Sequence, residues 1–146
     1  MPIVTPEGFR PADAPDFVPA GELPSGSGLA VDLPNDADAE ILAARFADIA
    51  LVRIPFPVYG DGRGFSLARQ LREMGYRGRL RASGYVISDQ FRHALQCGFD
   101  EVEIDDALAA RQPEPDWQLH DWPSYREKLA GEVIDATGAA VGASAG

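Results

Sequence analysis

The chain has 146 residues, of which 45% are hydrophobic, and it carries a net charge of −10. This length suits one domain with a substantial core, and the negative charge argues against nucleic acid as a partner. No apolar run reaches the roughly 20 residues of a membrane helix, the N-terminus lacks a signal-peptide layout, and the single cysteine excludes an internal disulfide. We therefore expect a cytoplasmic protein with no membrane partner.

Residues 1–28 are rich in proline, glycine and acidic residues. We expect an irregular N-terminal segment that holds at most short edge strands near Ile3-Val4 and Phe17-Val18. At the other end, Ser124 to Glu127 forms a capping box for a final short helix. The stretch 135–146 has too little apolar mass to order itself, so we expect a disordered tail.

Between these ends, apolar runs alternate with amphipathic stretches, which predicts an α/β domain over residues 29–134. The predicted strands are 29–33, 49–54, 78–84 and 99–104. The predicted helices are 37–48, a stretch around Leu67–Met74 ended by Gly75, a stretch from an N-capping Ser88 to Gly98, and 107–110 capped by Asp105 and Asp106. This βαβαβαβ order predicts a mainly parallel sheet of about four strands, either an open doubly wound sheet or half of a (β/α)8 barrel.

The stretch Phe56–Ser66 leaves a predicted buried strand, passes three glycines and enters a helix. Such a turn can bind an anion, because backbone amides converge on it and the helix N-terminus adds partial positive charge. The glycines match neither the dinucleotide fingerprint nor the phosphate loop of ATPases. One cysteine, Cys97, and two histidines, His93 and His120, supply no recognised metal spacing. We therefore assign no cofactor or metal.

The loops that follow the predicted strands should share one face, where sites in α/β proteins are built. The candidate ligand-binding residues on these loops are Asp61, Arg63, Ser66, Arg81, Asp89 and Gln90. Arg63 or Arg81 can hold an oxyanion through two parallel hydrogen bonds. The alternative is that Asp61 or Asp89 pairs with one of these arginines and braces the loops. No nucleophile and base can be paired from the sequence, so the catalytic residues are unknown.

Ser66 and Cys97 each admit a second interpretation. Gly64 to Ala68 approximates the nucleophile elbow of α/β-hydrolases, with Ser66 followed by Asp100 or Asp105 and then His120. An N-capping role for Ser66 is favoured over this hydrolase alternative. Cys97 precedes Gly98 at a predicted helix C-terminus, where a thiol is not activated, so we expect a small buried hydrophobic side chain.

The segment 53–92 contains eight arginines and three acidic residues, in a chain that is otherwise strongly acidic. Such a segment is either a solvated surface or a region that attracts a small anion or an acidic protein.

Several uncommon clusters occur in order along the chain and together carry a family resemblance. They are Asp61-Gly-Arg-Gly-Phe-Ser, Gly75-Tyr76, Leu80-Arg81-Ala82, Asp89-Gln90 and Cys97-Gly98-Phe99-Asp100. The chain resembles a small bacterial family (domain of unknown function 934) whose members are labelled oxidoreductases of sulfite reduction and are typically encoded beside assimilatory sulfite or nitrite reductase. The resemblance implies a role in sulfur assimilation, as an accessory protein or an oxidoreductase with sulfite as a ligand. The alternative is a non-catalytic module that docks on sulfite reductase or another sulfur-assimilation protein.

Overall fold

The structure is a computed structural model that describes residues 1–13 and 15–118, and its strands form one seven-stranded sheet in the order β2-β1-β7-β6-β5-β4-β3. The strands are β1 (Ile3–Thr5), β2 (Gly8–Arg10), β3 (Phe17–Pro19), β4 (Leu29–Asp32), β5 (Ile49–Phe56), β6 (Arg79–Gly84) and β7 (Glu101–Glu103). The α-helices are α1 (Arg63–Glu73), α2 (Ser88–Cys97) and α3 (Asp106–Arg111), and the 3₁₀ helices are η1 (Ala39–Asp48) and η2 (Glu114–Trp117).

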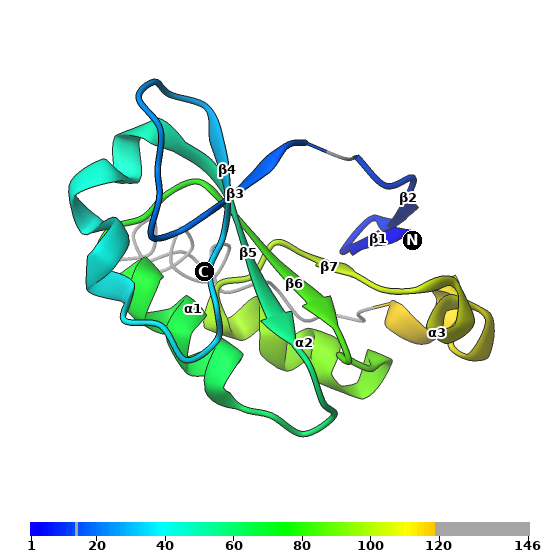
Figure 1. Cartoon of the computed structure of the whole chain (residues 1–146). Coiled ribbons are helices and arrows are strands. Elements are labelled where there is room, and N and C mark those ends of the chain that lie inside the picture. The colour runs from blue at the N-terminus through cyan, green and yellow to red at the C-terminus, as the bar shows by residue number, and fades with distance from the viewer. Residues whose placement is uncertain (14, 119–146) are drawn as a thin grey trace, which may run out of the picture.

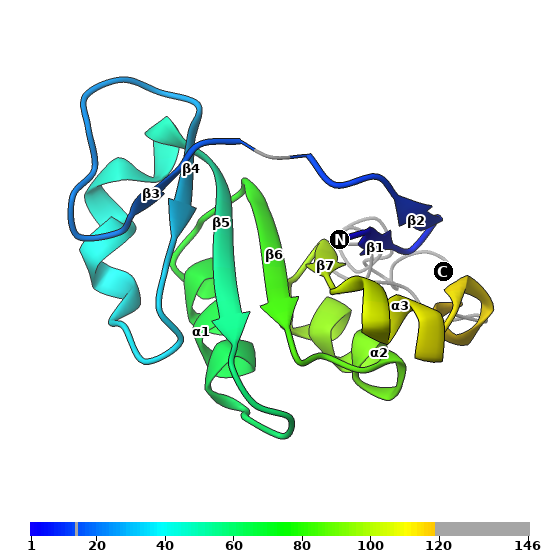
Figure 2. The same ribbon diagram turned by 45° about the vertical axis from the view of Figure 1, so that its right-hand side comes forward.

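The four predicted strands of the α/β body are present as β4 to β7, and they pair in parallel. Figure 2 shows β4, β5 and β6 running in the same direction. From β3 to β7 the order in the sheet follows the order in the chain. This is the order of consecutive units in a (β/α)8 barrel, whereas a doubly wound sheet reverses its order at a switch point.

The prediction of about four strands was wrong, because the sheet has seven strands and is partly antiparallel. The three additional strands lie within residues 3–19, where we expected at most short edge strands. β3 does lie at an edge and pairs in parallel with β4. β1, in contrast, lies inside the sheet, antiparallel to both β2 and β7. Its partner β7 is remote in sequence, so no local pattern could indicate the pairing.

One face of the sheet is apolar and covered by helices. Side chains alternate between the two faces of a strand, which places Val52 and Ile54 of β5, Leu80 and Ala82 of β6, and Val102 of β7 on the same side. All five are buried in the main hydrophobic cluster, together with apolar residues of η1, α1 and α2. Figure 1 shows α1 and α2 on this side, and β2 with the residues 11–13 that follow it on the other.

The helix boundaries agree with most of the predicted stop and cap signals. α1 is followed by Gly75, and Gly98 caps the C-terminus of α2. The Asp105 carboxylate accepts a hydrogen bond of 2.7 Å from the Leu108 amide and so caps α3. The prediction for α2 was wrong by one residue, because Ile87 takes the N-cap position and Ser88 is the first helical residue.

The opposite face of the sheet carries a cluster of paired charges, which we call the ion cluster. Its members are Arg10, Arg53, Arg79 and Arg81 with Asp13, Asp32, Glu101 and Glu103. The four positive and four negative charges balance. Members on neighbouring strands stand opposite each other, as with Asp32 and Arg53 or Arg81 and Glu101. This face is thus polar but electrically neutral.

Within the described ranges, no helix is long and apolar enough to cross a membrane. The predicted short helix at Ser124 and the predicted tail 135–146 lie outside the described residues.

Candidate functional site

The loop after β5 is closed by an ion pair between Asp61 and Arg63, two of the predicted ligand-binding residues. The Asp61 carboxylate accepts hydrogen bonds from Arg63 Nη2 at 2.8 Å, Arg63 Nε at 3.1 Å and the Arg63 amide at 3.1 Å. Asn35, in the loop after β4, donates a further bond of 3.1 Å to Asp61. The loop-bracing alternative therefore describes this pair, and a ligand contact of Arg63 stays a prediction.

The pKa of Asp61 therefore tests directly whether Arg63 pairs with it in the folded protein. Hydrogen bonds from the Arg63 side chain lower the pKa of Asp61 from 3.8 to about 2. Because the folded pKa lies below the unfolded value, the pair stabilises the fold above about pH 4, and this contribution is lost as the pH falls towards 2. We expect Arg63→Ala to return the pKa to near 3.8, so that at pH 3 the carboxyl is mostly protonated in the variant and ionised in the wild type. Carboxyl carbon NMR measures both states.

The matched control is Asn35→Ala, which removes the weakest of the contributions to the Asp61 pKa and should shift it far less. Equal titration curves for wild type and Arg63→Ala would contradict the assigned pairing.

Arg81 is completely buried at the centre of the ion cluster. Its Nε donates to Glu101 at 2.7 Å, its Nη1 to Glu103 at 3.2 Å and its Nη2 to Asp13 at 2.6 Å. Carboxylates of the protein itself thus engage all three guanidinium nitrogens. The alternative pairing of Arg81 with Asp89 is not formed, because Asp89 lies in the first turn of α2.

The remaining predicted residues lie at the starts of two helices. Gln90 accepts a hydrogen bond of 3.1 Å from the Ile87 amide and so helps to cap α2, while Asp89 is exposed beside it. Ser66 is exposed in the first turns of α1, but it is not the N-cap, because α1 begins at Arg63 and is capped by Gly62. The six residues therefore lie at three kinds of place: the loop after β5, the ion cluster, and the starts of α1 and α2.

The hydrolase alternative for Ser66 finds no geometric support among the described residues. Asp100 pairs with Arg72 at 2.9 Å, and Asp105 caps α3. The third member, His120, lies outside the described residues.

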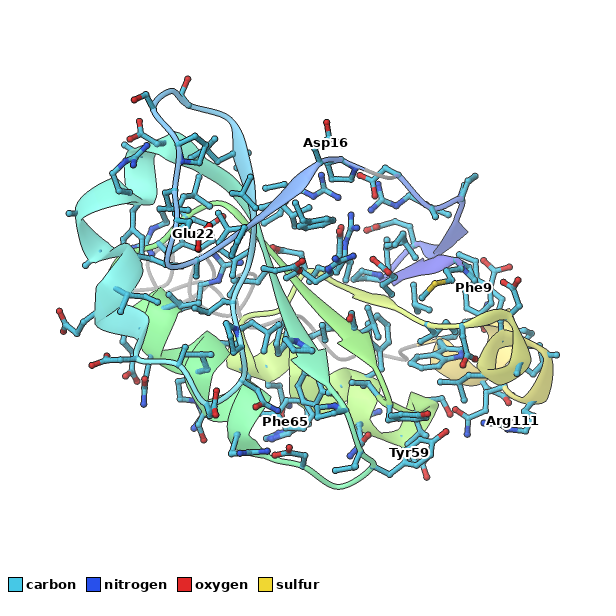
Figure 3. The ribbon with its side chains drawn as sticks, in the orientation of Figure 1. Phe9, Asp16, Glu22, Tyr59, Phe65 and Arg111 are labelled. Carbon is cyan, nitrogen blue, oxygen red and sulfur yellow. The ribbon has the colours of Figure 1, made fainter. Side chains whose placement is uncertain are left out.

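The loops after β5 and β6 do meet, as their predicted position at one edge of the sheet requires. The rings of Tyr59 and Tyr85 lie 4.7 Å apart, and the Tyr59 hydroxyl accepts a hydrogen bond of 3.2 Å from Arg111 of α3. Figure 3 shows Tyr59 and Arg111 side by side at this end of the molecule. Both tyrosines are exposed, so the surface at this end of the sheet is partly aromatic.

A cavity of about 310 Å³ lies between α1 and α2, and we call it the helix cavity. Its lining residues are Gly62, Phe65, Ser66, Arg69, Gln70, Glu73, His93 and Cys97. Ser66 is the predicted site residue that belongs to it. Phe65, labelled in Figure 3, forms one wall, and its ring packs edge-on against the His93 imidazole at 4.6 Å.

Three reactive side chains converge in the helix cavity. Arg69 Nη2 donates to the Cys97 sulfur at 3.4 Å, and His93 Nε2 lies 3.7 Å from the same sulfur. Burial raises the pKa of the Cys97 thiol, and the positive charge of Arg69 opposes that shift only in part. The thiol is therefore protonated at neutral pH, in agreement with the predicted buried and unactivated cysteine. Sequence reasoning missed Arg69 and His93 as partners, because no local pattern shows which faces of two helices meet.

Most of the arginines in the segment 53–92 are paired with carboxylates. Arg53, Arg63, Arg72, Arg79 and Arg81 each form a salt bridge, and most of the carboxylates come from outside the segment. Arg69 differs, because in the described part of the chain its partner is a thiol and no carboxylate pairs with it. In the same part of the chain, no group of three or more His, Cys, Asp or Glu is arranged to hold a metal ion.

Comparison with known proteins gives one family. A search of the curated proteins found no match, and neither did a search of the solved structures. Residues 30–132 match the family described as "Bacterial protein of unknown function (DUF934)". This stretch begins within β4 and contains β5 to β7, both helices of the helix cavity and most of the ion cluster. The chain belongs to this bacterial family.

Proposed function

We propose that the protein is an accessory protein of assimilatory sulfite reduction that binds a small oxyanion such as sulfite in the helix cavity. The link to sulfite reduction rests on the resemblance carried by the sequence motifs. The binding site is supported by the side chains that line the helix cavity.

The proposal rests on the observation that Arg69 lines the helix cavity without pairing with a carboxylate of the described residues. Its guanidinium has no carboxylate partner in the described residues, whereas Arg72 and Arg81 are each paired with a carboxylate. An arginine that faces a cavity without a counter-ion can form two charge-assisted hydrogen bonds to an oxyanion. Arg69 is therefore the positive group best placed to receive one.

The rest of the lining is compatible with a small anion. The exposed hydroxyl of Ser66 and the imidazole of His93 can donate hydrogen bonds, and the cavity opens beside Gly62 at the N-terminus of α1, where partial positive charge accumulates. Glu73 is the one carboxylate among the lining residues, and it does not pair with Arg69. The sulfur of Cys97 lies between the two basic side chains. These groups support binding; they assign no electron-transfer step.

Sulfite should raise the melting temperature of the protein, and Arg69→Ala should abolish the rise. At a concentration ten times the dissociation constant, binding adds about 1.4 kcal/mol to the free energy of unfolding. For a domain of this size that corresponds to roughly 5 °C. Differential scanning fluorimetry with freshly prepared sulfite, and with sulfate and phosphate at equal ionic strength, measures the shift and the preference among anions.

Arg77→Ala is the matched control, because Arg77 is an exposed arginine that does not line the helix cavity. This variant should keep the full response to sulfite. The proposal fails if none of the three anions shifts the melting temperature at millimolar concentration, or if Arg69→Ala responds as the wild type does.

A further inference from the structure

A larger cavity lies at the C-terminal ends of the parallel strands, on the face of the sheet that carries the ion cluster. It has a volume of about 610 Å³, and we call it the strand-end pocket. It is lined by residues from four adjacent strands, among them Phe17 and Pro19 of β3, Asp32 of β4, Arg53 and Pro55 of β5, and Ser83 of β6. Ligands of parallel α/β sheets bind at this end of the strands, and volumes of 300–1,000 Å³ are usual for small-molecule sites.

The walls of the strand-end pocket are mostly apolar. Phe17, Leu33, Ala37 and Ile41 line it together with three prolines, which have no amide hydrogen to donate. Ile41 is 50% exposed although its side chain is wholly aliphatic. A ligand with an apolar body would cover this surface and remove it from water, which is favourable.

The polar end of the pocket is a neutral pair of charges. Arg53 Nε and Nη2 donate to the two oxygens of Asp32 at 2.7 and 3.0 Å, and the guanidinium stacks on the Phe17 ring at 3.7 Å. The third nitrogen, Nη1, reaches only Glu103, at 3.4 and 3.5 Å. Arg53 can therefore donate a further hydrogen bond to a ligand, and the Asp32 carboxylate can accept one.

The charges on this face argue against an anion in the strand-end pocket. Arg53 is already compensated by Asp32 and Glu103, so an anionic ligand would meet Asp32 with no uncompensated cation nearby. A neutral group that donates to Asp32 and accepts from Arg53 would instead satisfy both partners. In the described residues the Ser83 hydroxyl forms no hydrogen bond, so it adds a further polar contact at the same end.

From these contacts we infer that the strand-end pocket binds an uncharged, flat ring compound whose edge carries a cyclic amide. The amide N–H donates to Asp32, the adjacent carbonyl accepts from Arg53, and the ring lies against the apolar walls. This site is on the opposite face of the sheet from the helix cavity, so it does not depend on the proposed oxyanion site.

The test uses 2-quinolinone as the probe, because it is uncharged, flat and bicyclic, with an amide N–H beside its carbonyl. Titration of the full chain, followed by amide NMR, should shift the signals of Gly21, Ala37 and Ser83 with a roughly millimolar dissociation constant. N-methyl-2-quinolinone has the same body without the donor, and it should bind about fivefold to tenfold more weakly.

Two variants locate the site. Ile41→Asp places a charge on the exposed apolar wall and should weaken binding of 2-quinolinone by about tenfold or more. Ala37→Phe should block the pocket, and Ala43→Phe, on the exposed side of η1, is its matched control and should bind normally. Because Ile41 is half exposed, Ile41→Asp tests the site even if Ala37→Phe fails to fold.

Three results would overturn the inference. One is the absence of any NMR shift at a millimolar concentration of 2-quinolinone. Another is equal affinity for the two quinolinones, which would mean that the amide N–H does not bind Asp32. The third is a concentration-dependent dimer that Ile41→Asp dissociates, which would assign the pocket to contact with a second copy. The sulfite response of Ile41→Asp separates this result from the proposed function, because the helix cavity is intact in that variant.

Discussion

Replacing Arg81 by alanine should lower the free energy of unfolding by about 3–5 kcal/mol, the loss expected when one member of a buried ion pair is removed. Arg81 is fully buried and holds three carboxylates at once. Without it, Glu101 and Glu103 remain on the sheet with less positive charge to compensate them. An uncompensated buried charge costs more than the pair contributes, which is why the expected effect is large.

Urea denaturation of Arg81→Ala and wild type measures this loss. Arg81→Lys should fall between the two, because an ammonium group keeps the charge but cannot reach three carboxylates with a planar fork. The control is Arg77→Ala, an exposed arginine outside the ion cluster, which should change stability by less than about 0.5 kcal/mol. A loss below about 1 kcal/mol for Arg81→Ala would contradict the tightly paired arrangement of the ion cluster.

Gly84→Ala should destabilise the protein by more than about 2 kcal/mol, through backbone strain and a direct clash. Gly84 ends β6 with a φ of 106°, a conformation that other residues rarely adopt. A Cβ atom there would lie 2.6 Å from the Phe56 carbonyl oxygen, which accepts a hydrogen bond from the Tyr85 amide. The substitution therefore forces β5 and β6 apart where their loops meet.

Gly60→Ala is the matched comparison, because Gly60 also has a positive φ, 78°, but no atom lies within 4 Å of a Cβ built there. It should cost only the conformational strain, about 1 kcal/mol. Equal losses for the two alanine variants in urea denaturation would show that the contact with Phe56 contributes nothing.

The parts of the fold that depend on neighbours in the chain could be predicted from the sequence. The apolar run that begins at Ile49 predicted β5, and the glycines after α1 and α2 predicted where those helices end. β1 could not be predicted as an internal strand, because its position depends on pairing with β7 almost a hundred residues later. The stretch that we expected to be irregular therefore completes the sheet.

The same distinction applies to the candidate site. Arg81 was predicted as a ligand-binding residue from its own strand alone, and the three carboxylates that pair with it could not be foreseen from that strand. Arginines alternate with apolar residues along β6, and glutamates alternate with an apolar residue along β7. This pattern indicates that, if the two strands pair, the arginines and glutamates would neutralise one another. Arg69 and Cys97 have no such signal, since the contact between two helix faces depends on how α1 and α2 pack.

The position of β1 beside β7 has a consequence for the order in which the protein folds during synthesis. β1 leaves the ribosome about a hundred residues before its partner, which at usual elongation rates is about 5–20 s. During that time β2 is the one of its two native partners that is available to Ile3 and Val4, and the prolines at positions 2 and 6 discourage pairing with other chains. Among the described strands, β1 can pair with β7 only after β7 has been synthesised, so until then the edge of β1 that faces away from β2 has no partner.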